Sequence, residues 1–141
     1  MPEVERGVIK NRKFASQIRD FSGLRFGNIT PTDIDGLIEY KNMAFIFIEL
    51  KYKDAVLPLG QRLALERLCD GLIKSSLLIV ASHDKGPDED IDVAKSIVSE
   101  IRFKRQWHKD DDSTTTSDMI IRYLGWVEME KHRMETTNGQ R

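Results

Sequence analysis

The chain has 141 residues, of which 40% are hydrophobic and 32% are charged, and its formal net charge is −1 at pH 7. This amount of apolar material predicts one domain with its own core, because two similar domains would each be too small. The near balance of charge excludes a broadly basic protein, so any nucleic-acid binding must come from local clusters of Lys and Arg.

The single cysteine, Cys69, excludes an internal disulfide and a zinc cluster of several thiolates. Its apolar neighbours Leu65, Leu68 and Leu72 indicate that the thiol is part of the core. The N-terminus lacks a signal-peptide pattern, and no segment has the ~20 apolar residues of a membrane span. We therefore expect a soluble, cytoplasmic protein with no membrane partner.

Residues 8–21 carry apolar side chains at roughly helical spacing, with basic residues between them. This pattern predicts a short helix with a basic outer side, which is either a solvated face or a face that contacts phosphates. Ser22 and Gly23, followed by Gly27 and Asn28, then break the pattern.

Two strands are predicted over residues 33–40 and 44–53, and the second contains the most apolar run of the chain. Because only residues 41–43 separate them, we expect an antiparallel hairpin. Asn42 is the residue best suited to the left-handed position of its loop.

The length of this loop decides which side chains face each other across the hairpin. A three-residue loop sets Asp35 opposite Glu49, and Asp33 opposite Lys51. A two-residue loop would move Asp35 to the other face of the sheet, unless a bulge intervened. We predict the three-residue loop.

After a turn over residues 54–60, residues 61–74 carry the clearest helical stripe of the chain, with Arg62 and Glu66 placed to pair on its outer side. Residues 76–82 form a continuous apolar strand of the kind that is buried on both faces. Strand, helix and strand in succession predict a right-handed parallel crossover.

The C-terminal part begins with an acidic loop over residues 84–90. Residues 91–103 suit either a helix or a strand, and their β-branched content favours a strand. After a polar loop, Ser117 and Asp118 predict the cap of a final helix that ends at about Lys131. We expect a single domain over residues 1–131 and a disordered tail over 132–141.

The polar residues around the most apolar strand are the candidates for function. Glu49 and Lys51 are two positions apart, so their side chains point to the same side of the strand, ~7 Å apart along the backbone. Carboxylates such as Asp35 and Glu49 on neighbouring strands can hold Mg²⁺, and a lysine can orient or deprotonate a water. Gln61, at the start of the next helix, is a candidate neighbour. The plainer interpretation is a surface ion pair at a strand end.

This arrangement, Asp35 followed by Glu49-Leu50-Lys51 on two consecutive strands and then a helix and a strand, resembles the PD-(D/E)XK nuclease superfamily. The resemblance covers roughly residues 10–85 and implies a restriction-endonuclease-like αβββαβ core, a central mixed sheet flanked by helices. That core needs an additional early strand, around residues 24–29. The proline of the family name is displaced here, because Pro31 lies before Asp33 rather than directly before Asp35.

The resemblance implies a metal-dependent nuclease that hydrolyses DNA phosphodiester bonds, in the manner of endonucleases of small genomes, phages or mobile elements. The metal would be Mg²⁺, with Mn²⁺ as a substitute, held by Asp35, Glu49 and the backbone carbonyl of Leu50. Lys51 would assist the attacking water, with Gln61 beside it and Asp33 in a supporting position. Members of this group often carry an acid on the first helix, for which Glu5 and Asp20 are weak candidates.

Three functional hypotheses follow. The first is the DNA nuclease, for which a homodimer is an expectation, since cutting both strands often needs two small domains. The second is a catalytically inactive module on the same fold that binds nucleic acid or a protein partner. The third is a structural protein unrelated to nucleic acid. His83 would approach the site only if the strand before it runs parallel to the Glu49 strand.

Overall fold

A computed structural model describes residues 7–9 and 12–139 of the chain. Contacts between residues divide the chain into two compact units, Met1–Thr32 and Asp33–Arg141. The single nuclease-like domain predicted over residues 1–131 would span both units, and it stays a prediction. All candidate site residues except the first-helix acids belong to the second unit.

The first unit contains little regular structure. Its helix α1 is a single turn, Arg12–Ala15, and a 3-10 turn follows at Ser22–Leu24. The helix predicted over residues 8–21 is therefore wrong for most of its length. Ile18, which was expected on the apolar side of this helix, is 79% exposed. A short helix that does not pack its apolar side against other residues is only marginally stable in water.

The early strand that the resemblance required is also absent. Within residues 24–29, Phe26 and Ile29 exchange two backbone hydrogen bonds of 2.9 Å around Gly27, which has a φ of +62°. This tight turn closes on itself and makes no contribution to the sheet. Of the first-helix acids, Asp20 lies outside α1 and its carboxylate accepts from Ser22. Glu5 lies outside the described residues.

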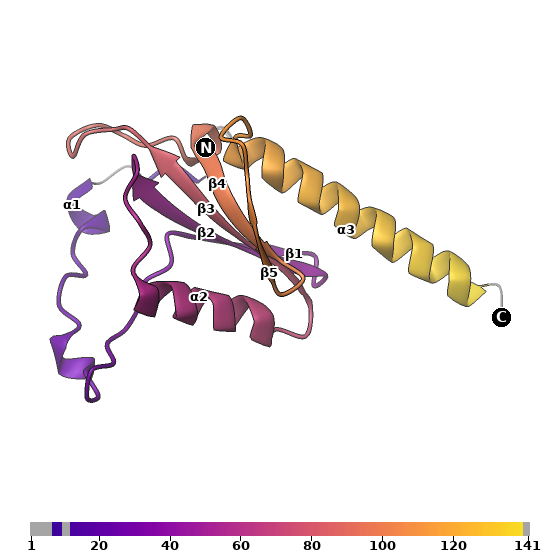
Figure 1. Ribbon diagram of the computed structural model, residues 1–141, viewed down its shortest axis with the longest axis horizontal. Coiled ribbons are helices and arrows are strands. Elements are labelled where there is room, and N and C mark those ends of the chain that lie inside the picture. The colour runs from indigo at the N-terminus through magenta and orange to yellow at the C-terminus, as the bar shows by residue number, and fades with distance from the viewer. Residues whose placement is uncertain (1–6, 10–11, 140–141) are drawn as a thin grey trace. The chain divides into compact units, whose positions relative to one another are not determined.

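The second unit is an α/β structure built on a five-stranded mixed sheet (Figure 1). The strands are neighbours in chain order, and β2 and β3 run parallel while the other pairs are antiparallel. Their bounds are β1 Gly36–Tyr40, β2 Ala44–Tyr52, β3 Ser75–His83, β4 Ile97–Phe103 and β5 Gln106–Lys109. The predicted mixed α/β fold is confirmed at this level.

Two helices, α2 (Leu59–Gly71) and α3 (Thr116–Gly139), cover opposite faces of the sheet. Alternate residues of β2 and β3 supply the two cores. On one face Phe47 and Val80 pack with Leu65 of α2, and on the other Ile46 packs with Tyr123 of α3. In Figure 1, the C-terminal half of α3 continues past the edge of the sheet.

The hairpin of β1 and β2 has the predicted register. Tyr40 pairs with Ala44 and Gly36 pairs with Ile48, which leaves residues 41–43 as a three-residue loop. Asn42 has the predicted left-handed conformation, with a φ of +58°. The first predicted strand begins too early, however. β1 starts at Gly36, so Asp33 and Asp35 precede the strand.

The crossover from β2 through α2 to the parallel strand β3 is confirmed. Residues 77–81 of β3 are all buried, as expected for a strand covered on both faces. The helix ends at Gly71 rather than Lys74, and Leu68 of the predicted apolar stripe is exposed. The predicted pairing of Arg62 with Glu66 is wrong, because Arg62 binds Glu100 of β4 instead.

The C-terminal part confirms the strand interpretation from Ile97 onward, preceded by a 3-10 turn at Val93–Lys95. α3 begins one residue before the predicted cap, because the hydroxyl of Thr115 accepts from the N–H of Asp118 at 3.1 Å. The helix continues to Gly139, so residues 132–139, predicted as a tail, are helical. No helix among the described residues has the length and apolar character needed to cross a membrane.

Candidate functional site

The carboxylate of Glu49 is buried at the end of β2, on the face that α2 covers. The residue is 3% exposed. Its Oε1 accepts a hydrogen bond from Gln61 Nε2 at 2.8 Å and lies 3.2 Å from Lys51 Nζ. Its Oε2 is buried and has no hydrogen-bond partner among the described residues. Such an atom is unusual, since buried polar groups are generally satisfied.

Lys51 and Gln61 complete a closed triangle with Glu49. The ammonium of Lys51 donates to Gln61 Oε1 at 3.0 Å, while Gln61 donates to Glu49 through its other amide atom. An ammonium has three donors, so these two contacts leave one N–H of Lys51 for a further acceptor. The structure thus brings together three residues that sequence reasoning singled out.

Asp35 lies beside this triangle, beyond the end of β1. Its Oδ2 accepts a hydrogen bond of 2.7 Å from the backbone N–H of Leu50. Gly36 and Ile48 are the outermost pair of the β1–β2 ladder on this side. The Asp35 carboxylate therefore binds the N–H of Leu50 just outside the ladder. Asp35 therefore does not reach its predicted place opposite Glu49 as a paired strand residue.

Asp33 does not take the supporting position expected opposite Lys51. It precedes β1, is exposed, and makes no hydrogen bond or ion pair with any residue that the structure describes. The pairing with Lys51 fails because β1 begins three residues later, at Gly36.

The surroundings of Glu49 hold the pKa of its carboxyl group above the usual value. Burial is the main cause, because the protein interior disfavours the charged form, and the negative charge of Asp35 adds to it. Lys51 and Gln61 act in the opposite direction, by interacting with the ionised form. A bound cation would favour the ionised form in the same way.

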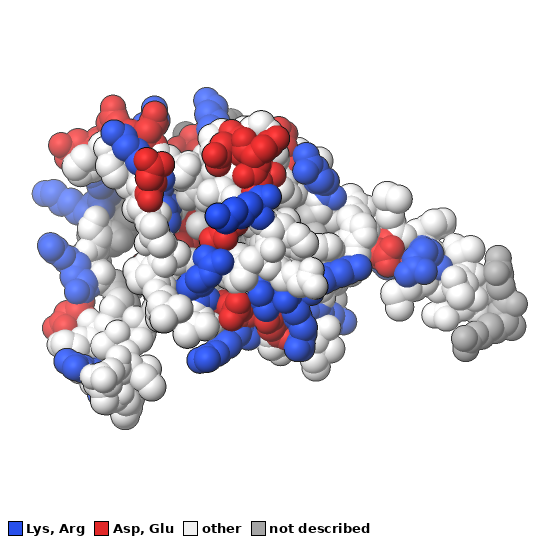
Figure 2. All heavy atoms as spheres, viewed as in Figure 1, with Lys and Arg blue, Asp and Glu red and all other residues white. Residues whose placement is uncertain are grey.

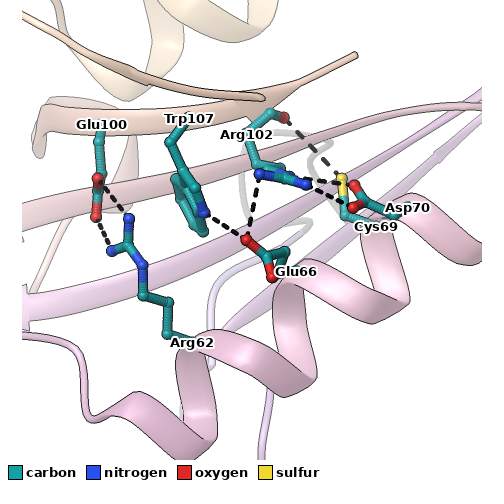
Figure 3. A network of polar contacts seen from close by, with 7 residues as sticks. All are labelled: Arg62, Glu66, Cys69, Asp70, Glu100, Arg102 and Trp107. Carbon is teal, nitrogen blue, oxygen red and sulfur yellow. Dashed lines mark hydrogen bonds and ion pairs between the residues drawn. The ribbon is translucent and has the colours of Figure 1, made fainter. Parts of the chain in front are cut away.

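A polar network attaches α2 to β4 and β5 (Figure 3). Arg62 makes two hydrogen bonds to Glu100, at 2.6 and 3.2 Å, and its guanidinium lies 3.9 Å from the centre of the Trp107 ring. One turn later, Glu66 accepts from Trp107 Nε1 at 2.7 Å. Because Gln61 directly precedes Arg62, these contacts hold the start of the helix against the sheet.

Sequence reasoning missed this network. The signal was present in the charged residues Glu100 and Arg102, which alternate with apolar residues along β4 and therefore share a face. Arg102 contacts both Glu66 and Asp70 of α2. Arg62 is engaged in this network through Glu100.

The residues present fit a divalent cation of the Mg²⁺ type, as two carboxylates and a backbone carbonyl are hard oxygen ligands. The unsatisfied Oε2 of Glu49 is the observation in favour. The described residues contain no group of three or more His, Cys, Asp or Glu side chains that could hold a metal ion. Water and substrate would have to supply the remaining ligands, which Mg²⁺ commonly accepts.

A cavity of about 440 Å³, here called the loop pocket, includes in its lining Ser82, the register partner of Lys51. It is lined by residues at the carboxyl ends of β2 and β3 and by the segment that leads into β4, including Lys53, Ser82, His83 and Lys85. His83 is the last residue of β3, which runs parallel to β2, as its approach to the site required. It pairs with Tyr52 rather than Lys51, and its ring lies 5.8 Å from that of Tyr52.

Charge is mixed over the visible surface. Figure 2 shows Lys and Arg interspersed with Asp and Glu, without a broad area of one sign. This agrees with the net charge of −1. Contacts to an anionic partner on this face must therefore be local.

Comparison of the chain with protein-family models, with curated proteins and with solved structures gives no match. The geometry of Glu49, Lys51, Gln61 and Asp35 is therefore the basis for assigning a function.

Proposed function

We propose that the protein is a metal-dependent nuclease that hydrolyses DNA phosphodiester bonds, on a core that resembles the restriction-endonuclease-like one without its early strand. One observation carries the proposal: a buried carboxylate oxygen of Glu49 without a partner, next to a lysine with an unused donor. Asp35 and Glu49 would hold Mg²⁺, with the Leu50 carbonyl as a third oxygen. When bound, the ion would neutralise phosphate charge and lower the pKa of a water.

The protein's own side chains have separate tasks in this proposal. Lys51 uses its remaining N–H to orient the attacking water or to stabilise negative charge that develops on the phosphate. Gln61 contacts both Lys51 and Glu49, so it keeps the ammonium beside the carboxylate. Asp35 is attached to the backbone of the same strand, between Glu49 and Lys51.

The test is a DNA-cleavage assay with Mg²⁺ or Mn²⁺, on single-stranded and duplex DNA. We expect Glu49→Gln, Asp35→Asn and Lys51→Ala each to lower cleavage at least about 100-fold, the usual effect of losing an acid–base or charge-stabilising group. Glu135→Gln and Lys74→Ala, at exposed positions outside the site, are the matched controls. Cleavage that persists in the site variants, or that never occurs with either metal, would refute the proposal.

A second candidate is a catalytically inactive module on the same fold. It is favoured by the engagement of Asp35 with Leu50, because the carboxylate that would hold the metal is already bound to a backbone N–H. DNA binding without cleavage, in wild-type protein that is folded and supplied with metal, would support this candidate over the nuclease.

A further inference from the structure

The loop pocket stands at the place where parallel strands bind ligands. β2 and β3 are the parallel pair of the sheet, and Lys53, Ser82 and His83 at their carboxyl ends line the cavity. Ligands of open α/β sheets bind outside the carboxyl ends of the strands. A volume of about 440 Å³ lies within the range of small-molecule sites.

The pocket adjoins the candidate site. Ser82, which lines it, is the register partner of Lys51, and paired residues of neighbouring strands share a face. Lys53 lies in the turn directly after β2, two residues beyond Lys51. A nucleic acid with one phosphate bound at Lys51 would therefore have its neighbouring nucleotide close to the loop pocket.

The lining offers cationic groups suited to a phosphate. Lys53, Lys85 and Lys95 contribute three ammonium groups to it. Lys53 and Lys85 form no ion pair with any residue in the described part of the chain, and Lys95 is 4.0 Å from Asp92 at an exposed position. Lysines bind phosphate as point charges.

The same lining contains three aspartates, Asp84, Asp90 and Asp92, and two isoleucines, Ile91 and Ile97. Asp92 already accepts a hydrogen bond of 3.2 Å from the backbone N–H of Ala94 through its Oδ1. Equal numbers of Lys and Asp make the pocket a weak site for a bare anion. A nucleotide fits better, because its base has an apolar face for the isoleucines. The amino group of cytosine, adenine or guanine can also donate to a carboxylate.

We infer that the loop pocket binds one nucleotide of the nucleic-acid substrate, with its phosphate at the lysines and its base edge at the aspartates. This inference rests on the proposed nuclease function. Contact between the base edge and the aspartates predicts a preference for cytosine over thymine. Cytosine presents an amino donor where thymine presents a carbonyl acceptor. Two pyrimidine nucleotides of similar size thus distinguish recognition of the base from attraction by charge alone.

The experiment is a titration of the full-length protein with dCMP, dTMP, deoxycytidine and inorganic phosphate, followed by calorimetry or by NMR chemical shifts. We expect dCMP to bind most tightly, and dTMP, deoxycytidine and phosphate each to bind at least about fivefold more weakly, an effect of one lost hydrogen bond or ion contact. Equal binding of dTMP and dCMP would overturn the role of the aspartates.

The variant for this test is Lys53→Ala combined with Lys85→Ala, and its matched control is Lys74→Ala combined with Lys131→Ala. All four lysines are exposed, so thermal melting should confirm that both proteins fold. We expect the pocket variant to bind dCMP about tenfold more weakly, whereas the control stays within about twofold. Equal loss in both variants, or loss in neither, would overturn the inference.

A further comparison separates this inference from the proposed function. Glu49→Gln should abolish cleavage while leaving dCMP affinity unchanged, because Glu49 is not part of the pocket lining. If wild-type protein binds dCMP as described but never cleaves DNA, the nuclease proposal fails alone. If cleavage depends on Glu49 but the pocket variant keeps its KM for DNA, the substrate role of the pocket fails alone.

Discussion

Glu49 is the residue whose charge state connects stability with function. Its folded pKa is raised above the ordinary 4.5. As the pH rises above 4.5, the unfolded chain releases this proton before the folded chain does, so the free energy of unfolding falls until the pH has passed the folded pKa. An ionised, metal-free Glu49 therefore destabilises the fold near neutral pH.

The first prediction is that Glu49→Gln is more stable than the wild type at neutral pH without divalent metal. The advantage should shrink as the pH falls through 4.5, because the wild-type carboxyl group becomes protonated in both states below this value. Thermal melting between pH 4 and 8, in buffers of constant ionic strength (~0.1 M), measures it. A constant difference across this range would show that Glu49 does not titrate as described.

The second prediction concerns the metal. Mg²⁺ should raise the melting temperature of the wild type, because an ion that binds only the folded state stabilises it by mass action. Glu49→Gln and Asp35→Asn should lose this shift, and Glu135→Gln should retain it. NaCl at matched ionic strength is the control for screening. An equal shift in all four proteins would place the ion elsewhere.

At the scale of elements, the β1–β2 hairpin depends on a loop with two left-handed residues, Lys41 at φ +50° and Asn42 at φ +58°. Asparagine tolerates this conformation better than most residues, whereas a β-branched side chain does not. The loop fixes the register that places Gly36 opposite Ile48.

The third prediction is that Asn42→Val destabilises the protein by about 1–2 kcal/mol, the cost of a left-handed β-branched residue. Asn42→Gly should be close to neutral, because glycine adopts this conformation freely. Urea unfolding of both variants measures the difference. Equal stabilities of the valine and glycine variants would refute the conformational argument.

The attachment of α2 to the sheet depends on charged contacts at a partly buried interface. Arg102 has a side chain that is 12% exposed, and it contacts Glu66 at 3.2 Å and Asp70 at 2.6 Å. Its hydrogen bonds to Asp70, and secondarily its charge, hold the pKa of the Asp70 carboxyl group below the ordinary value. Removing this one cation takes away the ion-pair partner of two acids of α2.

The fourth prediction is that Arg102→Ala lowers the free energy of unfolding by about 2 kcal/mol, the usual value of hydrogen bonds to charged groups. Arg133→Ala is the matched control, since Arg133 makes an exposed ion pair with Glu130 within α3 and should contribute little. Chemical denaturation of both variants tests this. A similar loss from both would show that burial does not distinguish the two pairs.

At the scale of the whole molecule, the mixture of charges limits how the protein can bind DNA. The chain has 22 Lys and Arg against 23 Asp and Glu, and both signs are interspersed on the face seen in Figure 2. Each phosphate contact adds close to one unit to the dependence of log affinity on log salt. Few contacts therefore give a weak dependence.

The fifth prediction is that DNA affinity, measured between about 50 and 200 mM salt, changes with a slope smaller in magnitude than about 4. Lys53→Ala combined with Lys85→Ala should reduce the slope, while Lys74→Ala combined with Lys131→Ala should not. A steep slope that the pocket lysines do not affect would indicate a different DNA-binding surface.

The sequence by itself determined the central part of the fold. The apolar run before Glu49 and the continuous apolar strand over residues 76–82 predict buried neighbouring strands, since only a covered sheet accepts such runs. The short loop at residues 41–43 predicts the hairpin and its register, because turn geometry is local. The proximity of Gln61 to Glu49 and Lys51 follows from the same strand-to-helix order.

Only the tertiary structure decided the rest. The start of β1 at Gly36, the partner of Arg62 and the extension of α3 to Gly139 depend on contacts between residues distant in sequence. The same is true of the unsatisfied Glu49 oxygen and of the loop pocket, which assemble from several segments. The periodicity of the sequence predicts which face of a helix or strand is apolar. Which side chains of different helices and strands come into contact is determined by their packing in three dimensions.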